Sequence, residues 1–155
     1  MNKLTLSNSK ALKLSNVVSV DVEKNDLIDF KKNVEQLDNY IKSKGSQPIG
    51  PLVQKTKIQI DENGEKTINV SLLRQSNNFL VHVDSPYSIK STIRVKDCMY
   101  VHFLGPENKA NIAVDKINVQ AFEDGIELED EVYIIFLGEV DDYSVVDVFI
   151  EKKHS

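Results

Sequence analysis

The sequence contains no tryptophan, a single cysteine and few aromatic residues, which make up 7% of its 155 positions. One cysteine excludes an intramolecular disulfide and any zinc site built from several cysteines. A chain of this length buries roughly 68–70% of its unfolded surface, so it can fold without covalent or metal support. The apolar (41%) and charged (28%) shares are those of an ordinary globular protein. The length predicts one domain over residues 1–155.

Long apolar runs are also missing. The first 18 residues lack the apolar core of a signal peptide, and no segment reaches the ~18 apolar residues of a membrane span. We therefore expect a cytoplasmic protein without a membrane anchor, although export by a leaderless route would leave no mark in the sequence. The single cysteine fits a reducing compartment.

Lys and Arg are absent from one long segment near the C-terminal end of the sequence. Residues 117–151 contain eleven acidic side chains and no Lys or Arg, and the formal net charge is −5. Because nucleic-acid binding depends on cations that neutralise phosphates, we expect no direct contact with nucleic acid. Two interpretations remain for the acidic segment, a solvated face that keeps the protein soluble or a surface that docks a basic partner.

Motifs for cofactors and common catalytic centres are missing too. The sequence has no P-loop, no dinucleotide-binding glycine pattern, no Gly-x-Ser-x-Gly and no His-Glu-x-x-His. The segment 61–64 resembles the start of a calcium loop, but its glycine comes too early and Leu72 occupies the position of the closing glutamate. We expect no cofactor, no metal and no catalytic residue.

The first half of the sequence predicts a strand, a helix and a hairpin. The strand covers 17–22, and the helix extends from an Asp26 cap to Lys44, with Gly45 in the left-handed position that ends it. One helical face carries an apolar stripe, formed by Leu27, Phe30, Val34, Leu37 and Ile41. Asn63-Gly64 then predicts a tight turn between two strands, 48–60 and 67–73. A further short strand is predicted at 79–83.

The second half repeats this order. An extended segment at 89–95 leads into CMYVHFLGPEN (98–108), and a helix is predicted to start just after Pro106 and to end at Gly125. Two strands, 131–137 and 145–151, follow with a polar turn between them. The apolar face of this helix is predicted to consist of Ala110, Ala113, Val114, Ile117, Ala121 and Phe122.

These patterns predict an α+β protein made of two strand-helix-strand-strand units, residues 12–83 and 89–152. The two units would form one antiparallel sheet with both long helices on one face. Five features of the sequence form a further pattern: VKDCMYVHFLGPENK (95–109), Gly45, Gly50-Pro51, Glu131-Val132-Tyr133 and VVDVFIEK (145–152). Together with the duplicated order, they resemble the GyrI-like family, bacterial effector-binding domains found alone or fused to AraC-type and MerR-type regulators.

The resemblance implies a binding site between the sheet and the helices, and a stand-alone form without a DNA-binding domain. The sequence departs from the family pattern at Glu107, where tyrosine is usual, and in having no tryptophan, so the aromatic wall is thinner. The chain also resembles, more loosely, small proteins of Gram-positive bacteria encoded near type VII secretion toxin genes.

Glu131 is the main candidate for a ligand-binding residue, because a carboxylate that begins an apolar strand can anchor a ligand. Tyr133 shares its face, and Tyr100 and His102 share a face of the strand that leads to Gly105-Pro106, opposite the face of Met99, Val101 and Phe103. The alternatives are a solvent-exposed Glu131 and a half-exposed strand histidine at 102. Cys98 and His102 would lie ~13 Å apart along a strand, too far for proton transfer, so we interpret Cys98 as a small buried residue.

His82 and Asp84, two residues apart on the predicted strand, are interpreted as a surface pair. The sequence as a whole predicts a non-enzymatic binding module for a small molecule or peptide. The alternative is an accessory protein of a secretion or toxin system that docks a protein partner through its acidic face. A hydrolase is the third possibility, because some GyrI-like proteins are hydrolases.

Overall fold

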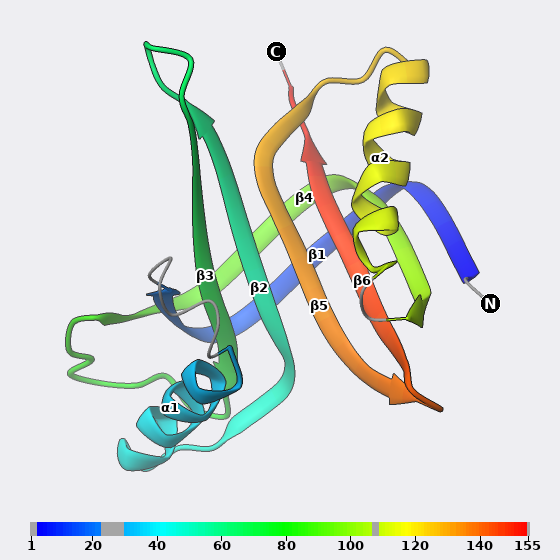
Figure 1. Cartoon of the computed structure of the whole chain (residues 1–155). Coiled ribbons are helices and arrows are strands. Elements are labelled where there is room, and N and C mark those ends of the chain that lie inside the picture. Colours follow the sequence, from blue (N-terminus) through cyan, green and yellow to red (C-terminus); the bar gives the residue numbers. More distant parts are fainter. Residues whose placement is uncertain (1–2, 23–29, 107–108, 155) are drawn as a thin grey trace. The chain divides into compact units, whose positions relative to one another are not determined.

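The computed structural model describes residues 3–22, 30–106 and 109–154. Strands and helices follow in the order β1 (Lys3–Val22), α1 (Phe30–Ser43), β2 (Pro48–Ile60), β3 (Lys66–Ser76), β4 (Tyr87–Pro106), α2 (Asn111–Glu123), β5 (Leu128–Val140) and β6 (Tyr143–Lys152) (Figure 1). This content agrees with the predicted α+β class, although strands form most of the described chain. The chain divides into a first unit, Lys13–Arg94, and a second unit, Met1–Leu12 with Val95–Ser155.

The first unit has the strand order β1-β3-β2, with antiparallel pairing throughout. The C-terminal part of β1 pairs with β3 from Val17↔Gln75 to Val22↔Val70, and β3 pairs on its other side with β2. Helix α1 packs against β2 and β3. Leu37 and Ile41 of its apolar stripe are fully buried, as the three- and four-residue spacing predicted.

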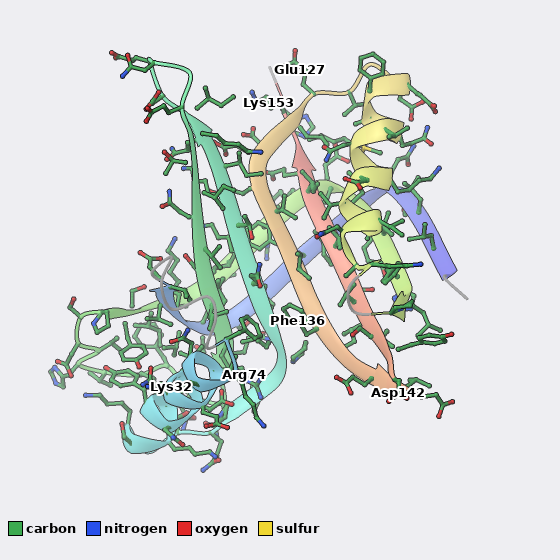
Figure 2. All side chains as sticks on the ribbon, in the orientation of Figure 1. Lys32, Arg74, Glu127, Phe136, Asp142 and Lys153 are labelled. Atoms are coloured by element: carbon green, nitrogen blue, oxygen red, sulfur yellow. The ribbon has the colours of Figure 1, made fainter. Side chains whose placement is uncertain are left out.

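An ion pair accompanies this apolar contact. Arg74 Nε of β3 lies 3.5 Å from Asp38 Oδ1 of α1, and neither atom has a hydrogen-bond partner among the described residues. Arg74 lies beside α1 in Figure 2. Gly45 has φ +81° and ends the helix as predicted. The predicted cap Asp26 and the start of the stripe lie outside the described residues.

The β2–β3 hairpin is confirmed, but its turn is longer than predicted. The connection covers residues 61–65, and of Asn63 and Gly64 only Gly64 has a positive φ, +79°. The carboxylate of Asp61 accepts hydrogen bonds from the backbone N–H groups of Asn63 and Glu65. This side chain, rather than a two-residue turn, closes the loop.

The strand predicted at 79–83 is wrong, because residues 77–86 form an irregular loop. Lys44 Nζ, at the end of α1, donates to the carbonyl of His82 and to the Asp84 carboxylate, both at 3.1 Å. His82 has φ +59°, which no regular strand accommodates. The Tyr40 hydroxyl accepts from the Asp84 N–H. His82 and Asp84 are therefore not the strand-face pair that was predicted.

The second unit has the strand order β4-β6-β5, again antiparallel. Helix α2 lies alongside β6 (Figure 1) and covers one face of this sheet. The buried cluster between them comprises Met99, Val101, Phe103, Ala113, Ile117, Ala121, Val132, Val146, Val148 and Ile150. The predicted polar turn between β5 and β6 is confirmed, and its two central residues, Asp141 and Asp142, have φ +49° and +68°.

Helix α2 begins later than predicted, at Asn111. Pro106 is not in its first turn, because it ends β4 as the cross-strand partner of Tyr143. The pairing of β4 with β6 extends to the first residue of β6 and holds this proline in the sheet. Glu107 lies outside the described residues. Phe122, predicted to be in the core, is 87% exposed, while Gly125 (φ +68°) follows the helix as predicted.

Several details recur in the two units. Each begins with a strand that contains one left-handed residue, Asn16 in the first unit and Asp97 in the second. The backbone N–H of the preceding residue donates a hydrogen bond to a side chain of the unit's third strand. The donor and acceptor are Ser15 and Gln75 in the first unit, and Lys96 and Glu151 in the second. Strands β2 and β5 are both 13 residues long. No helix within the described ranges is long and apolar enough to span a membrane.

Candidate functional site

The predicted site residues lie on the sheet face of the second unit that α2 does not cover. Side chains alternate between the two faces of a strand, and Met99, Val101 and Phe103 of β4 pack in the cluster with α2. Tyr100 and His102 therefore point to the opposite face. Helix α2 therefore packs against the face opposite to the one that carries Tyr100 and His102.

Three aromatic side chains form a row across this face. Tyr100 and Tyr133 are both cross-strand partners of Phe149, which lies between them on β6. The Tyr100 and Phe149 ring centroids are 4.9 Å apart with the planes tilted by 47°, a favourable aromatic geometry. Tyr133 and Phe149 are buried, and Tyr100 is partly exposed. The row combines residues that lie far apart in the sequence.

Glu131 and Tyr133 interact directly. The Tyr133 hydroxyl donates to Glu131 Oε2 at 3.1 Å, and Glu131 is partly exposed. Burial raises the pKa of Tyr133, and the neighbouring Glu131 carboxylate raises it further by disfavouring a second negative charge. The tyrosine thus stays a neutral donor that orients the carboxylate. The predicted shared face of these two residues is confirmed.

Asp147 joins the other two predicted residues. Its Oδ1 atom lies 2.9 Å from the Tyr100 hydroxyl and 2.6 Å from His102 Nδ1. A carboxylate only accepts hydrogen bonds, so Nδ1 carries a proton and the other ring nitrogen, Nε2, is directed away from Asp147. Burial raises the pKa of Tyr100 to about 12, and the hydrogen bond from its hydroxyl to Asp147 is the second cause of this shift. The sequence reasoning missed Asp147; its signal is one acidic residue within the apolar strand VVDVFI.

A lysine also reaches this face. Lys10 Nζ of β1 lies 5.1 Å from the centroid of the Tyr100 ring, within the range of a cation–π contact. Local sequence patterns do not predict this contact, since ninety positions separate the two residues. Lys10 is exposed, and its ammonium lies over the face of the Tyr100 ring.

Cys98 is fully buried, as predicted. Burial, more than the nearby Glu151 carboxylate, raises the pKa of its thiol to about 12, so the nucleophilic thiolate is scarce at neutral pH. The thiol donates to the Val95 carbonyl at 3.7 Å. His102 is hydrogen bonded to Asp147 instead, which supports the rejection of a Cys98–His102 dyad.

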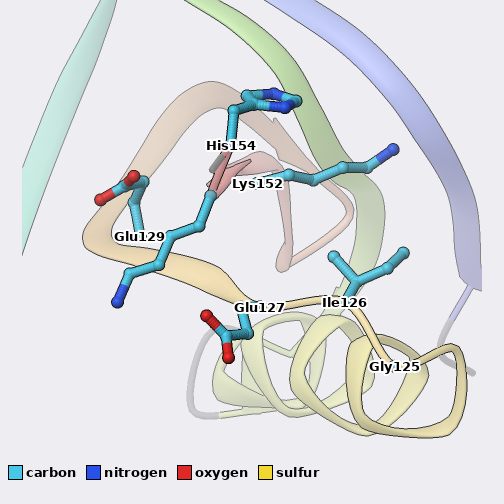
Figure 3. A pocket seen from close by; sticks show the side chains of 7 residues that line it. Gly125, Ile126, Glu127, Glu129, Lys152 and His154 are labelled. Atoms are coloured by element: carbon cyan, nitrogen blue, oxygen red, sulfur yellow. The ribbon is translucent and has the colours of Figure 1, made fainter.

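A separate depression of about 690 Å³ lies at the C-terminal end of α2 (Figure 3). Its polar lining is mixed, with Glu127 and Glu129 beside two lysines, Lys152 and Lys153, and the imidazole of His154. Lys152 and His154 both pair with Asp97, at 3.3 and 3.2 Å. None of the predicted site residues lines it. Among the described residues, no group of three or more His, Cys, Asp or Glu side chains is placed to hold a metal ion.

Comparisons with known proteins show the fold. No protein-family model matches the sequence, and no curated protein matches it. Solved structures do match. A hydrolase from Listeria innocua has a TM-score of 0.54 and 15% identity, over 97% of this chain and 92% of that one. EcmrR, solved in complex with DNA, has a TM-score of 0.63 and 14% identity, over 98% of this chain but only 58% of its own.

SAV2435, solved with bound tetraphenylphosphonium, has a TM-score of 0.52 and 6% identity, over 95% of this chain and 94% of that one. Identities this low show a shared fold alone. It is the fold that the resemblance to the GyrI-like effector-binding domains predicted.

Proposed function

We propose that this protein is a non-enzymatic binding module whose ligand, a small organic molecule or peptide, contacts the aromatic row of the second unit. Glu131 is the polar anchor, and Tyr100, His102 and Tyr133 line the site. The observation that carries the proposal is the combination on one sheet face of three aromatic rings with two carboxylates, Glu131 and Asp147.

The chemistry of this face favours a ligand with a positive charge. Aromatic faces attract cations, and nearby carboxylates strengthen the attraction when water is excluded. The Lys10 ammonium already occupies such a position over Tyr100. The structural neighbour SAV2435 was solved with the organic cation tetraphenylphosphonium, which makes this compound a suitable first probe.

A thermal-shift screen of organic cations, neutral analogues and peptides tests the proposal. A ligand at a hundred times its Kd stabilises a protein by about 2.7 kcal/mol, or roughly 5–10 °C for a chain of this size. Glu131→Gln should reduce the shift, whereas Asp130→Asn, which removes the same charge from the adjacent exposed position of β5, should leave it intact. If no compound shifts the wild type, or if the two variants behave alike, the assigned site is wrong.

Hydrolysis is the second candidate, and the His102–Asp147 hydrogen bond of 2.6 Å favours it. Asp147 holds the imidazole so that Nε2 can take a proton from water while the water oxygen bonds to an acyl carbon. The bond from this carbon to the leaving-group oxygen then breaks, and that oxygen receives the proton. Two structural neighbours from Listeria innocua are hydrolases. If the wild type hydrolyses esters and His102→Ala does not, hydrolysis replaces binding as the proposed function. If the wild type hydrolyses no ester, this second candidate is removed.

We also infer that the chain arose by duplication, with halves near the predicted 12–83 and 89–152. The shared strand orders, the paired left-handed residues and the equal lengths of β2 and β5 support this inference. Gly45→Ala and Gly125→Ala test it locally. An added Cβ meets no atom within 4 Å at either site, so each substitution should cost only the left-handed strain of about 1–2 kcal/mol. Clearly unequal losses of stability would count against equivalence of the two helix ends.

A further inference from the structure

Helix α2 has an outward face that differs from that of an ordinary surface helix. Its buried side is formed by Ala113, Ile117 and Ala121. On the opposite side, Phe122 is 87% exposed and Val119 is 53% exposed. These two residues are three positions apart and therefore neighbours on the helix surface. A nearly fully exposed phenylalanine beside an exposed valine is a candidate contact point for another molecule.

The equivalent helix provides an internal comparison. Counted back from the terminating glycines, Gly45 and Gly125, the two buried residues of α1 occupy the same positions as two of the three in α2, eight and four residues earlier. At three and six residues earlier, α1 has exposed Lys42 and Asn39, where α2 has Phe122 and Val119. The same helix position is thus compatible with polar residues, and packing within the unit does not require the apolar pair.

The apolar pair is flanked by negative charge. Asp115 and Glu123, four positions before and after Val119, are both exposed and are its neighbours on the helix surface. Lys116 of the same helix is exposed too, and Asp124, just after the helix, accepts a 3.0 Å hydrogen bond from Gln120. A second copy of the chain would bring a similarly acidic face and the same net charge of −5, which disfavours self-association at this surface. Charge complementarity instead favours a basic partner.

We propose that the outward face of α2 is a protein-docking surface that binds a basic amphipathic segment, with an apolar side chain against Phe122 and Val119 and Lys or Arg against the acidic rim. The aromatic anchor supplies most of the binding energy, as is usual for interfaces, and the rim supplies orientation and the rate of association. This surface is distinct from the aromatic row on the sheet, so it stands independently of the proposed ligand site.

The probe is a random peptide library displayed on phage. It is selected on the wild-type protein after removal of binders to a Val119→Asn/Phe122→Lys variant, which transfers the residues of α1 to α2. Selected peptides should combine Lys or Arg with large apolar residues, and salt should weaken their binding. In titrations with synthetic versions, Phe122→Lys should weaken binding by about tenfold or more. Phe79→Lys, at an exposed phenylalanine of the first unit, should leave the affinity unchanged.

Three outcomes would overturn the proposal. In the first, selection returns no peptide that distinguishes wild type from variant, and in the second, the enriched peptides lack basic residues. In the third, the wild type sediments as a dimer that Phe122→Lys dissociates, which would make a second copy the occupant of this face. Unchanged melting temperatures confirm that the exposed substitutions leave the fold intact.

Discussion

Replacing Asp147 by alanine should destabilise the protein mainly through two other residues, Tyr100 and His102. Both donate a hydrogen bond to the Asp147 carboxylate, at 2.9 and 2.6 Å. A net hydrogen bond contributes about 0.5–1.5 kcal/mol. The side chains of His102 and Asp147 are 39% and 19% exposed, so water compensates for part of the loss at the histidine. We expect a cost of about 2 kcal/mol in the free energy of unfolding.

The test measures this cost in two backgrounds. In a Tyr100→Phe/His102→Ala protein both donors are gone, so Asp147→Ala should then cost less than about 0.5 kcal/mol. Urea unfolding at neutral pH gives the four free energies, provided that the m values agree. An equal cost in both backgrounds would refute the reasoning, because Asp147 would then stabilise the sheet without these hydrogen bonds.

Further predictions concern ionisation and the anchoring of α1. The thiol of Cys98 should not react with a thiol reagent in the native protein at pH 8 and should react fully in denaturant; rapid native labelling would contradict its burial. Because the pKa values of Tyr100 and Tyr133 are raised in the folded state, both stay protonated above pH 10 while the unfolded chain ionises. Stability should therefore fall as the pH rises above 10, and Tyr133→Phe should flatten this fall in urea titrations. Arg74→Leu should destabilise by about 1–3 kcal/mol, and adding Asp38→Leu should recover part of the loss; a double variant less stable than either single one would contradict the pairing.

Local patterns predicted most of the elements, because local physics determines them. The three- and four-residue spacing identified the buried residues Leu37 and Ile41 of α1, and glycines marked both helix ends. The prediction of a strand at 79–83 was wrong because contacts from Lys44 and Tyr40, which are distant in sequence, compete with the β-type composition of this segment. The prediction that Phe122 is in the core was wrong because helical periodicity assigns residues to faces of a helix. It does not show which apolar residues have a neighbour to pack against.

The candidate site was predictable only in part, for the same reason. Alternation along one strand placed Tyr100 with His102, and Glu131 with Tyr133. Which sheet face α2 covers depends on tertiary packing, and α2 covers the face opposite to Tyr100 and His102. Asp147 reaches the site through the register between β4 and β6, which no single strand reveals.

The central claim is that the aromatic row of the second unit binds the ligand, and NMR of the aromatic side chains tests it most directly. Tetraphenylphosphonium is titrated into protein with labelled tyrosine and phenylalanine rings. The account predicts that the signals of Tyr100, Tyr133 and Phe149 shift together with one Kd, and that Glu131→Gln weakens this Kd. Saturable binding that leaves these three rings unchanged and instead shifts residues of the depression at Gly125–His154 would contradict it, as would the absence of any shift.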